Sequence, residues 1–247
     1  MNENKDELID RSIDGLTMDD DKKHLIEDAE KVVEETRRSK SYEVEKSNSI
    51  FLRWFYWSAV FLGELQIPED RIRYFLTAYL ESSREVQSSI VLALHGSYKN
   101  AVQILRNWLE LIVAGIYYDH HQAEGKAWEE KGYYTRFKTF KSRLERDRVL
   151  STETLRDISS AWERLSAYVH SLARVLEGAS AKTGYGAVFP EYNESYFNKW
   201  FGFLEEIYNL CCILLVEHIP EVLKSEETKH FFKLKALDEL RGRVLSK

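Results

Sequence analysis

The pattern of apolar and polar positions is clearest between Ser97 and Tyr118, where polar side chains occupy one narrow face of a helix. The residues of that face lie three or four positions apart, and they are Lys99, Gln103, Arg106 and Glu110. Beyond Glu110 the segment is apolar on every side. A helix of this kind is buried among others, so the pattern predicts the central helix of a bundle.

The same three-and-four spacing predicts further helices on both sides of this segment. They cover residues 17–46, 47–65, 68–94, 131–148, 151–177 and 193–219, and a terminal helix begins at Ser225. Ser97, Ser151 and Asn193 are residue types that cap helices, and each precedes a predicted helix. Residues 178–192 lack the periodicity and are predicted to form the longest loop of the bundle.

These elements predict an all-α fold, a mostly antiparallel multi-helix bundle with a peripheral charged N-terminal helix. Helix 17–46 has only a thin apolar stripe, so it is expected to pack at the edge of the bundle or to reach a second subunit. Three prolines and eleven glycines in 247 residues favour long, uninterrupted helices. We expect residues 1–46 to form an acidic arm and helix, and residues 47–247 to form one helical-bundle domain.

The formal net charge of −6 is unevenly distributed along the chain. Residues 1–49 hold fifteen acidic and nine basic residues, whereas the remainder holds twenty-six of each. A neutral main body does not favour broad, nonspecific binding of nucleic acid, although a local basic patch remains compatible with it.

Several features predict a soluble protein of the cytoplasm. Cys211 and Cys212 are adjacent in an apolar run, which fits neither a disulfide framework nor a zinc site and favours a reducing compartment. The charged residues from Asn2 to Asp10 exclude an ordinary secretory signal. The longest apolar runs are much shorter than the roughly 20 residues of a membrane span, so no membrane partner is expected.

Helix 47–65 carries aromatic side chains around its whole circumference, including Phe51, Trp54, Phe55 and Tyr56. One buried face does not need so many, and unpaired apolar surface favours association. We therefore predict a homodimer. The aromatic surface and the acidic N-terminal surface are also candidates for binding a different protein.

The segment 131–148 has the strongest local excess of positive charge, with seven basic and two acidic residues. Its apolar residues are spaced as the buried stripe of an amphipathic helix. The candidate RNA-binding residues lie away from that stripe, and they are Arg136, Lys138, Lys141 and Arg143. The alternative is a solvated basic face that balances the acidic N-terminal arm.

Two short groups of histidine and carboxylate residues raise the question of a metal site. His120 precedes Glu124 by four residues, and Glu217, His218 and Glu221 form a similar group. Such pairs are common at polar helix ends, where imidazole meets the negative end of the helix dipole. We predict neither a metal site nor a cofactor from them.

Arg106 and Glu110 are spaced to form an ion pair along the central helix. If the bundle covers them, they must be paired and hydrogen-bonded, and they become candidates for a small-ligand pocket. The apolar residues around them favour partial burial.

Two further patterns carry a resemblance to known families. Arg164 and His170 are separated by five residues on a predicted bundle helix, and this resembles the Arg…His motif of the HEPN superfamily of nucleotide-binding domains. The second pattern is similar to a helix signature of uncharacterised prokaryotic helical proteins, some of them related to phage abortive infection. It consists of Gly96, Tyr98, Ala101, Leu105, Arg106 and Glu110.

The HEPN resemblance implies metal-independent cleavage of RNA in a cleft between two protomers, as in a defence or toxin-type protein. Arg164 would stabilise the charge on the phosphorane, and His170 would act as general acid or base. Leu165 departs from the family pattern, which has a polar residue after the arginine. The alternative hypothesis is a noncatalytic helical interaction or regulatory protein that acts through protein partners.

Overall fold

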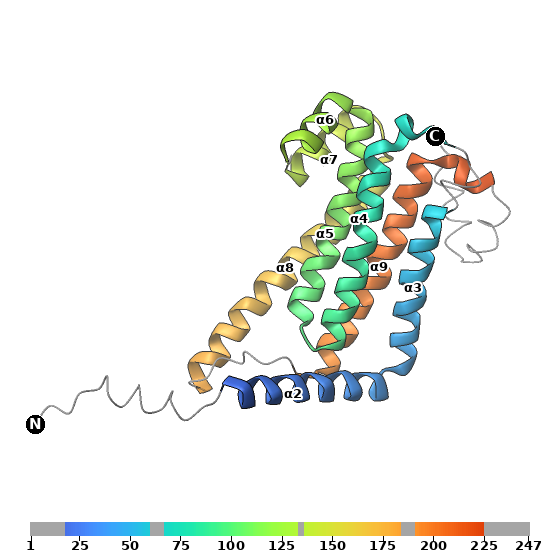
Figure 1. Ribbon diagram of the computed structural model, residues 1–247. Coiled ribbons are helices and arrows are strands. Elements are labelled where there is room, and N and C mark those ends of the chain that lie inside the picture. The colour runs from blue at the N-terminus through green and yellow to red at the C-terminus, as the bar shows by residue number, and fades with distance from the viewer. Residues whose placement is uncertain (1–17, 60–66, 133–135, 184–190, 225–247) are drawn as a thin grey trace, which may run out of the picture.

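The computed structural model describes residues 18–59, 67–132, 136–183 and 191–224 of the chain. Within these ranges all the regular structure is helical, which confirms the predicted all-α bundle (Figure 1). The elements are α2 (Met18–Ser39), α3 (Ser41–Ala59), α4 (Glu69–Leu94), α5 (Tyr98–His120), α6 (Gln122–Lys131), α7 (Phe137–Arg146), α8 (Thr152–Thr183), α9 (Glu194–His218) and the 3-10 helix η2 (Pro220–Lys224). Thr17 and the terminal helix predicted from Ser225 lie outside the described residues.

α5 is the central helix, as its sequence pattern predicts. It contacts α4, α6, α7, α8 and α9, and its residues from Ile112 to Tyr118 are all buried. Its contact with α4 is close because α5 has a glycine there. A Cβ atom at Gly115 would lie 2.8 Å from the Cα of Phe75 on α4. The two helices therefore pack nearly backbone to backbone along this stretch.

α4 and α5 run antiparallel and are joined by the tight turn at His95 and Gly96. Gly96 has a φ of 77°, and a Cβ atom there would lie 2.5 Å from the carbonyl oxygen of Glu191. The turn needs glycine for both reasons. Ser97 is the N-cap of α5, although its side chain makes no capping hydrogen bond. Asn193 caps α9 as predicted, because its side chain accepts the Tyr196 N–H at 3.0 Å.

The predicted N-terminal helix ends earlier than its sequence indicates. The break lies at Lys40 rather than near Lys46, and α2 lies across the end of the bundle while α3 runs along its side (Figure 1). The buried Lys40 holds this corner, since its Nζ lies 2.7 Å from an oxygen of Glu194. α2 thus has the peripheral position that was predicted for the charged N-terminal helix.

Two other predicted boundaries are wrong. Segment 131–148 is divided by Gly132, which ends α6 in the left-handed conformation, so the basic helix is α7 alone. α8 continues to Thr183 and so occupies part of the segment predicted as a loop, 178–192. Within α7 the apolar stripe is as predicted, with Phe137, Phe140 and Leu144 buried.

α3 is divided between the core and the surface. Trp54 is buried against Tyr79 and Trp108, with ring centroids 4.6 and 5.1 Å apart. Leu52 and Phe55, in contrast, are 62% and 54% exposed, so one face of α3 leaves large apolar side chains uncovered. In the described part of the chain, no helix is both long enough and apolar enough to span a membrane.

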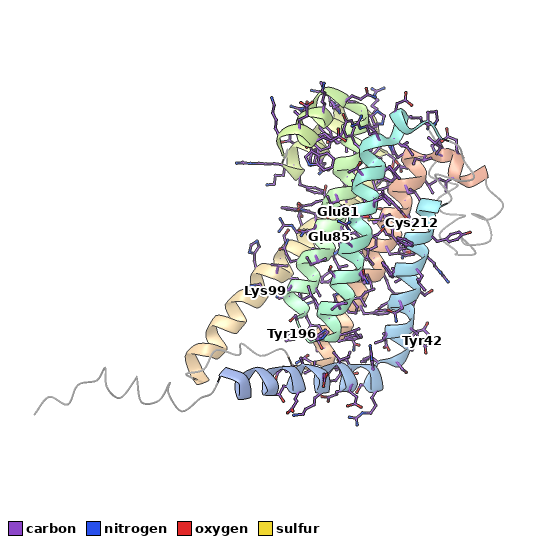
Figure 2. The ribbon with its side chains drawn as sticks, viewed as in Figure 1. Tyr42, Glu81, Glu85, Lys99, Tyr196 and Cys212 are labelled. Atoms are coloured by element: carbon purple, nitrogen blue, oxygen red, sulfur yellow. The ribbon has the colours of Figure 1, made fainter. Side chains whose placement is uncertain are left out.

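Cys211 and Cys212 are both free thiols buried in the core of the bundle. Figure 2 shows Cys212 on α9 within the bundle. Burial raises the pKa of Cys212 to about 12. A thiol of this kind stays protonated and acts as a small apolar side chain.

Candidate functional site

A groove of about 290 Å³ lies between α7 and α8. α7 lines one side with Phe137, Lys138, Lys141, Ser142 and Glu145, and α8 lines the other with Ser159, Trp162 and Glu163. α7 is placed there by its stripe of buried aromatic and aliphatic side chains, which pack against α5 and α8. The groove thus contains two of the predicted RNA-binding residues, Lys138 and Lys141.

Trp162 is held in place by the predicted polar pair of the central helix. Its Nε1 donates a hydrogen bond of 2.6 Å to Glu110, and the Arg106 guanidinium lies 5.0 Å from its ring centroid. Phe137 stacks on the same indole, with centroids 5.2 Å apart and an interplanar angle of 11°. Trp162, on α8, is therefore fixed in the wall of the groove by contacts from two other helices, α5 and α7.

Arg106 and Glu110 form the predicted ion pair, with 2.9 Å between Arg106 Nε and a Glu110 oxygen. Their side chains are 23% and 14% exposed, which agrees with the expected partial burial. Because Glu110 also accepts from Trp162, the pair links the central helix to the groove. Neither Arg106 nor Glu110 lines the groove itself, so their contacts indicate that they position Trp162.

The four predicted RNA-binding residues do not have equivalent surroundings. Arg136 and Lys138 are exposed and Lys141 is half-buried, and none of the three takes part in an ion pair among the described residues. Arg143 forms short hydrogen bonds to Glu124 and to the hydroxyl of Tyr117. These bonds raise the pKa of Arg143. Its guanidinium is occupied within the fold, so it is less available to a phosphate than the other three cations.

Arg164 and His170 share α8, but Arg164 is engaged with its neighbours. Its guanidinium forms an ion pair with Glu206 of α9 and donates to the Ser160 hydroxyl at 2.7 Å. His170 is exposed. Six residues on an α-helix separate two positions by about 9 Å along the axis and about 120° around it. Arg164 therefore faces α9, and it reaches a phosphate shared with His170 only by leaving Glu206.

A buried histidine–aspartate contact that sequence reasoning missed joins the ends of α5 and α9. His218 Nε2 lies 2.8 Å from Asp119 Oδ2, and the side chains are 6% and 2% exposed. The other oxygen of Asp119 accepts the backbone N–H groups of Tyr74 and Phe75 at 2.9 and 3.3 Å. These N–H groups follow the kink of α4 at Ile72, so Asp119 acts as a cap for the main part of α4.

The other carboxylates of these helix ends also have structural partners. Glu217 accepts from the backbone N–H and hydroxyl of Ser151 and from the Thr154 hydroxyl, which fixes the start of α8. Glu221 pairs with Arg71 at 2.6 Å. Burial, together with the nearby His218, lowers the pKa of His120. The described residues contain no group of three or more histidine, cysteine or carboxylate side chains suited to a metal ion.

Comparison with models of protein families found no match, and comparisons with curated proteins and with solved structures found none either. The described residues define an all-helical bundle protein.

Proposed function

We propose that the protein binds RNA through the surface formed by α7 and α8, as a HEPN-like helical protein of the cytoplasm. The observation that carries the proposal is the set of three cations without ion-pair partners among the described residues, Arg136, Lys138 and Lys141, beside a groove with an aromatic wall. Cations on one surface hold a phosphate backbone, and a groove beside them accepts a nucleotide.

The charge distribution of the chain supports local rather than general binding of nucleic acid. The acidic surplus lies in residues 1–49, and the rest of the chain is neutral. The α7 surface is therefore a local positive region on a protein of negative net charge. Binding of this kind is expected to be modest in affinity and to weaken as salt is added.

The first prediction concerns the lysines of this surface. The double variant Lys138→Glu/Lys141→Glu is expected to bind single-stranded RNA at least about tenfold more weakly. The slope of log affinity against log salt concentration is expected to fall by the equivalent of about two phosphate contacts. Fluorescence anisotropy of a labelled RNA, repeated over a series of salt concentrations, measures both quantities.

The matched control is Lys31→Glu/Arg84→Glu, which makes the same change of charge at exposed residues of α2 and α4. If this control weakens binding as much as the α7 variant does, net charge alone governs the interaction and the proposed surface is wrong. Equal affinity of the wild type and the α7 variant also contradicts the proposal.

The alternative function, a noncatalytic interaction protein, is favoured by the exposed apolar face of α3. Leu52, Phe55 and Tyr56 are 62%, 54% and 40% exposed on neighbouring turns of one helix. An uncovered face of this type favours contact with a second copy or with another protein. A homodimer through α3 is compatible with both functions, because α3 is a different part of the surface from α7 and α8.

The second prediction is that the purified protein is a dimer and that the apolar face of α3 holds it together. Leu52→Glu/Phe55→Glu is expected to yield a monomer of unchanged helix content, since charges on this face oppose its burial. Light scattering gives the molar mass and circular dichroism the helix content. A monomeric wild type at micromolar concentration, or a dimeric variant, contradicts the assignment of α3 as the interface.

A further inference from the structure

We infer that the groove between α7 and α8 holds one unpaired base of an RNA strand and selects bases that carry an amino group. The inference rests on the proposed RNA binding and names the kind of RNA that the surface recognises. Its basis is the size of the groove, its rigid aromatic wall and the hydrogen-bonding character of its polar lining.

The size of the groove fits one base. Pockets for drug-sized ligands span about 300–1,000 Å³, and this groove, at about 290 Å³, lies just below that range. It has room for a single heterocycle of the size of a nucleobase. Lys138 and Lys141, three residues apart on α7, lie at the same groove, where their charges meet the phosphate attached to that nucleotide.

The aromatic wall is prepared for binding. The Trp162 indole is fixed by its hydrogen bond to Glu110, by the Arg106 guanidinium and by the stacked ring of Phe137. A side chain held by three contacts loses little further freedom when a ligand packs against it. The Arg106–Glu110 ion pair of α5 therefore supports the wall of the groove through Trp162.

Apart from Lys138 and Lys141, whose ammonium groups are assigned to the phosphate, the polar side chains that line the groove offer hydrogen-bond acceptors. The hydroxyl of Ser142 donates to the Thr139 carbonyl at 3.1 Å, and that of Ser159 donates to the Leu155 carbonyl at 2.8 Å. Each serine hydrogen is therefore used within its own helix, and only the oxygen lone pairs remain for a ligand. The carboxylates of Glu145 and Glu163, which also line the groove, accept hydrogen bonds as well.

An acceptor-rich groove distinguishes between the bases. Cytosine and adenine present an exocyclic amino group that donates to a carboxylate or to a serine oxygen, and cytosine N4 paired with glutamate is a recognised contact. Uracil presents a carbonyl oxygen at the corresponding position, which is repelled by the carboxylates. In a duplex the same edges are already paired and stacked, so the groove favours single strands.

The test measures the affinity of short labelled oligo(rC), oligo(rU) and an RNA duplex of equal length by fluorescence anisotropy. The wild type is expected to bind oligo(rC) about fivefold or more tightly than oligo(rU), and more tightly than the duplex. Ser159→Phe fills the groove without changing charge, and it is expected to remove this preference while leaving salt-dependent binding to the lysines. Ser88→Phe, at an exposed serine of α4, is the matched control.

Glu163→Gln supplies a second variant that leaves the groove open. A glutamine amide also donates hydrogen bonds, so the preference for oligo(rC) over oligo(rU) is expected to fall below about twofold. The inference is overturned if the wild type binds the three RNAs equally, or if both groove variants keep the preference for oligo(rC). In either case, a loss of affinity in Lys138→Glu/Lys141→Glu still supports RNA binding by this surface. If no RNA binds the wild type, the proposed function itself fails.

Discussion

Replacement of Asp119 by alanine is expected to lower the free energy of unfolding by about 3–5 kcal/mol. The carboxylate is 2% exposed, and it binds both His218 and the backbone N–H groups of Tyr74 and Phe75. Its removal leaves those buried N–H groups without an acceptor, and each unsatisfied group costs about 1–3 kcal/mol. The loss of the His218 contact adds to this. Urea unfolding followed by circular dichroism gives the difference.

Two variants separate the contributions of Asp119. Asp119→Asn keeps one acceptor oxygen for the α4 backbone, so it is expected to be less harmful than alanine. His218→Ala removes the imidazole that contacts Asp119 and leaves the capping of α4 intact. If Asp119→Ala unfolds within about 1 kcal/mol of the wild type, the buried pair does not stabilise the junction of α4, α5 and α9.

The central helix could be predicted from the sequence because its signal is local. After Glu110 the helix is buried on all sides, so its sequence there is a run of apolar residues. That run can be recognised without knowing which helices pack against it. The caps at Ser151 and Asn193 are local in the same sense, since each side chain accepts from an N–H three residues ahead. The Arg106–Glu110 ion pair was also foreseeable from its four-residue spacing.

The features that the sequence did not reveal depend on contacts between distant residues. Lys40 ends α2 by pairing with Glu194, and Asp119 meets His218 across almost one hundred positions. No residue near Lys40 is a helix breaker, so helical spacing alone continues through it. Asp119 and His218 each resemble an ordinary polar residue at a helix end, and only the packing of the ends of α5 and α9 shows that they are buried together.

The candidate site was predictable in part. The basic residues of 131–148 identify the surface, but the groove exists only because α7 packs beside α8 and because Trp162 is fixed from α5. The occupation of Arg143 by Glu124 and Tyr117 depends on the position of α6, a helix that the sequence analysis did not predict. The Arg164 ion pair with Glu206 is a tertiary contact of the same kind.

RNA cleavage provides the largest expected effect on activity. By its resemblance to the HEPN motif, the protein is proposed to cleave single-stranded RNA without added metal, with His170 moving the proton and Arg164 stabilising the phosphorane. His170→Ala is expected to lower the rate by about 10²–10⁴-fold, the usual effect of losing positioned proton transfer. His170 is exposed, so the substitution leaves the fold intact. Gel analysis of a labelled strand in the presence of a chelator measures the rate.

The ion pair between Arg164 and Glu206 supplies the control that separates catalysis from structure. Both side chains are substantially exposed, and a surface ion pair contributes at most about 1 kcal/mol, so Arg164→Ala and Glu206→Gln are both expected to fold. If Arg164 acts on the phosphate, Arg164→Ala slows cleavage while Glu206→Gln, which releases the guanidinium, keeps or raises the rate. Equal losses in the two variants indicate a structural role only. A His170→Ala variant as active as the wild type contradicts the catalytic assignment, and the two-protomer cleft with it.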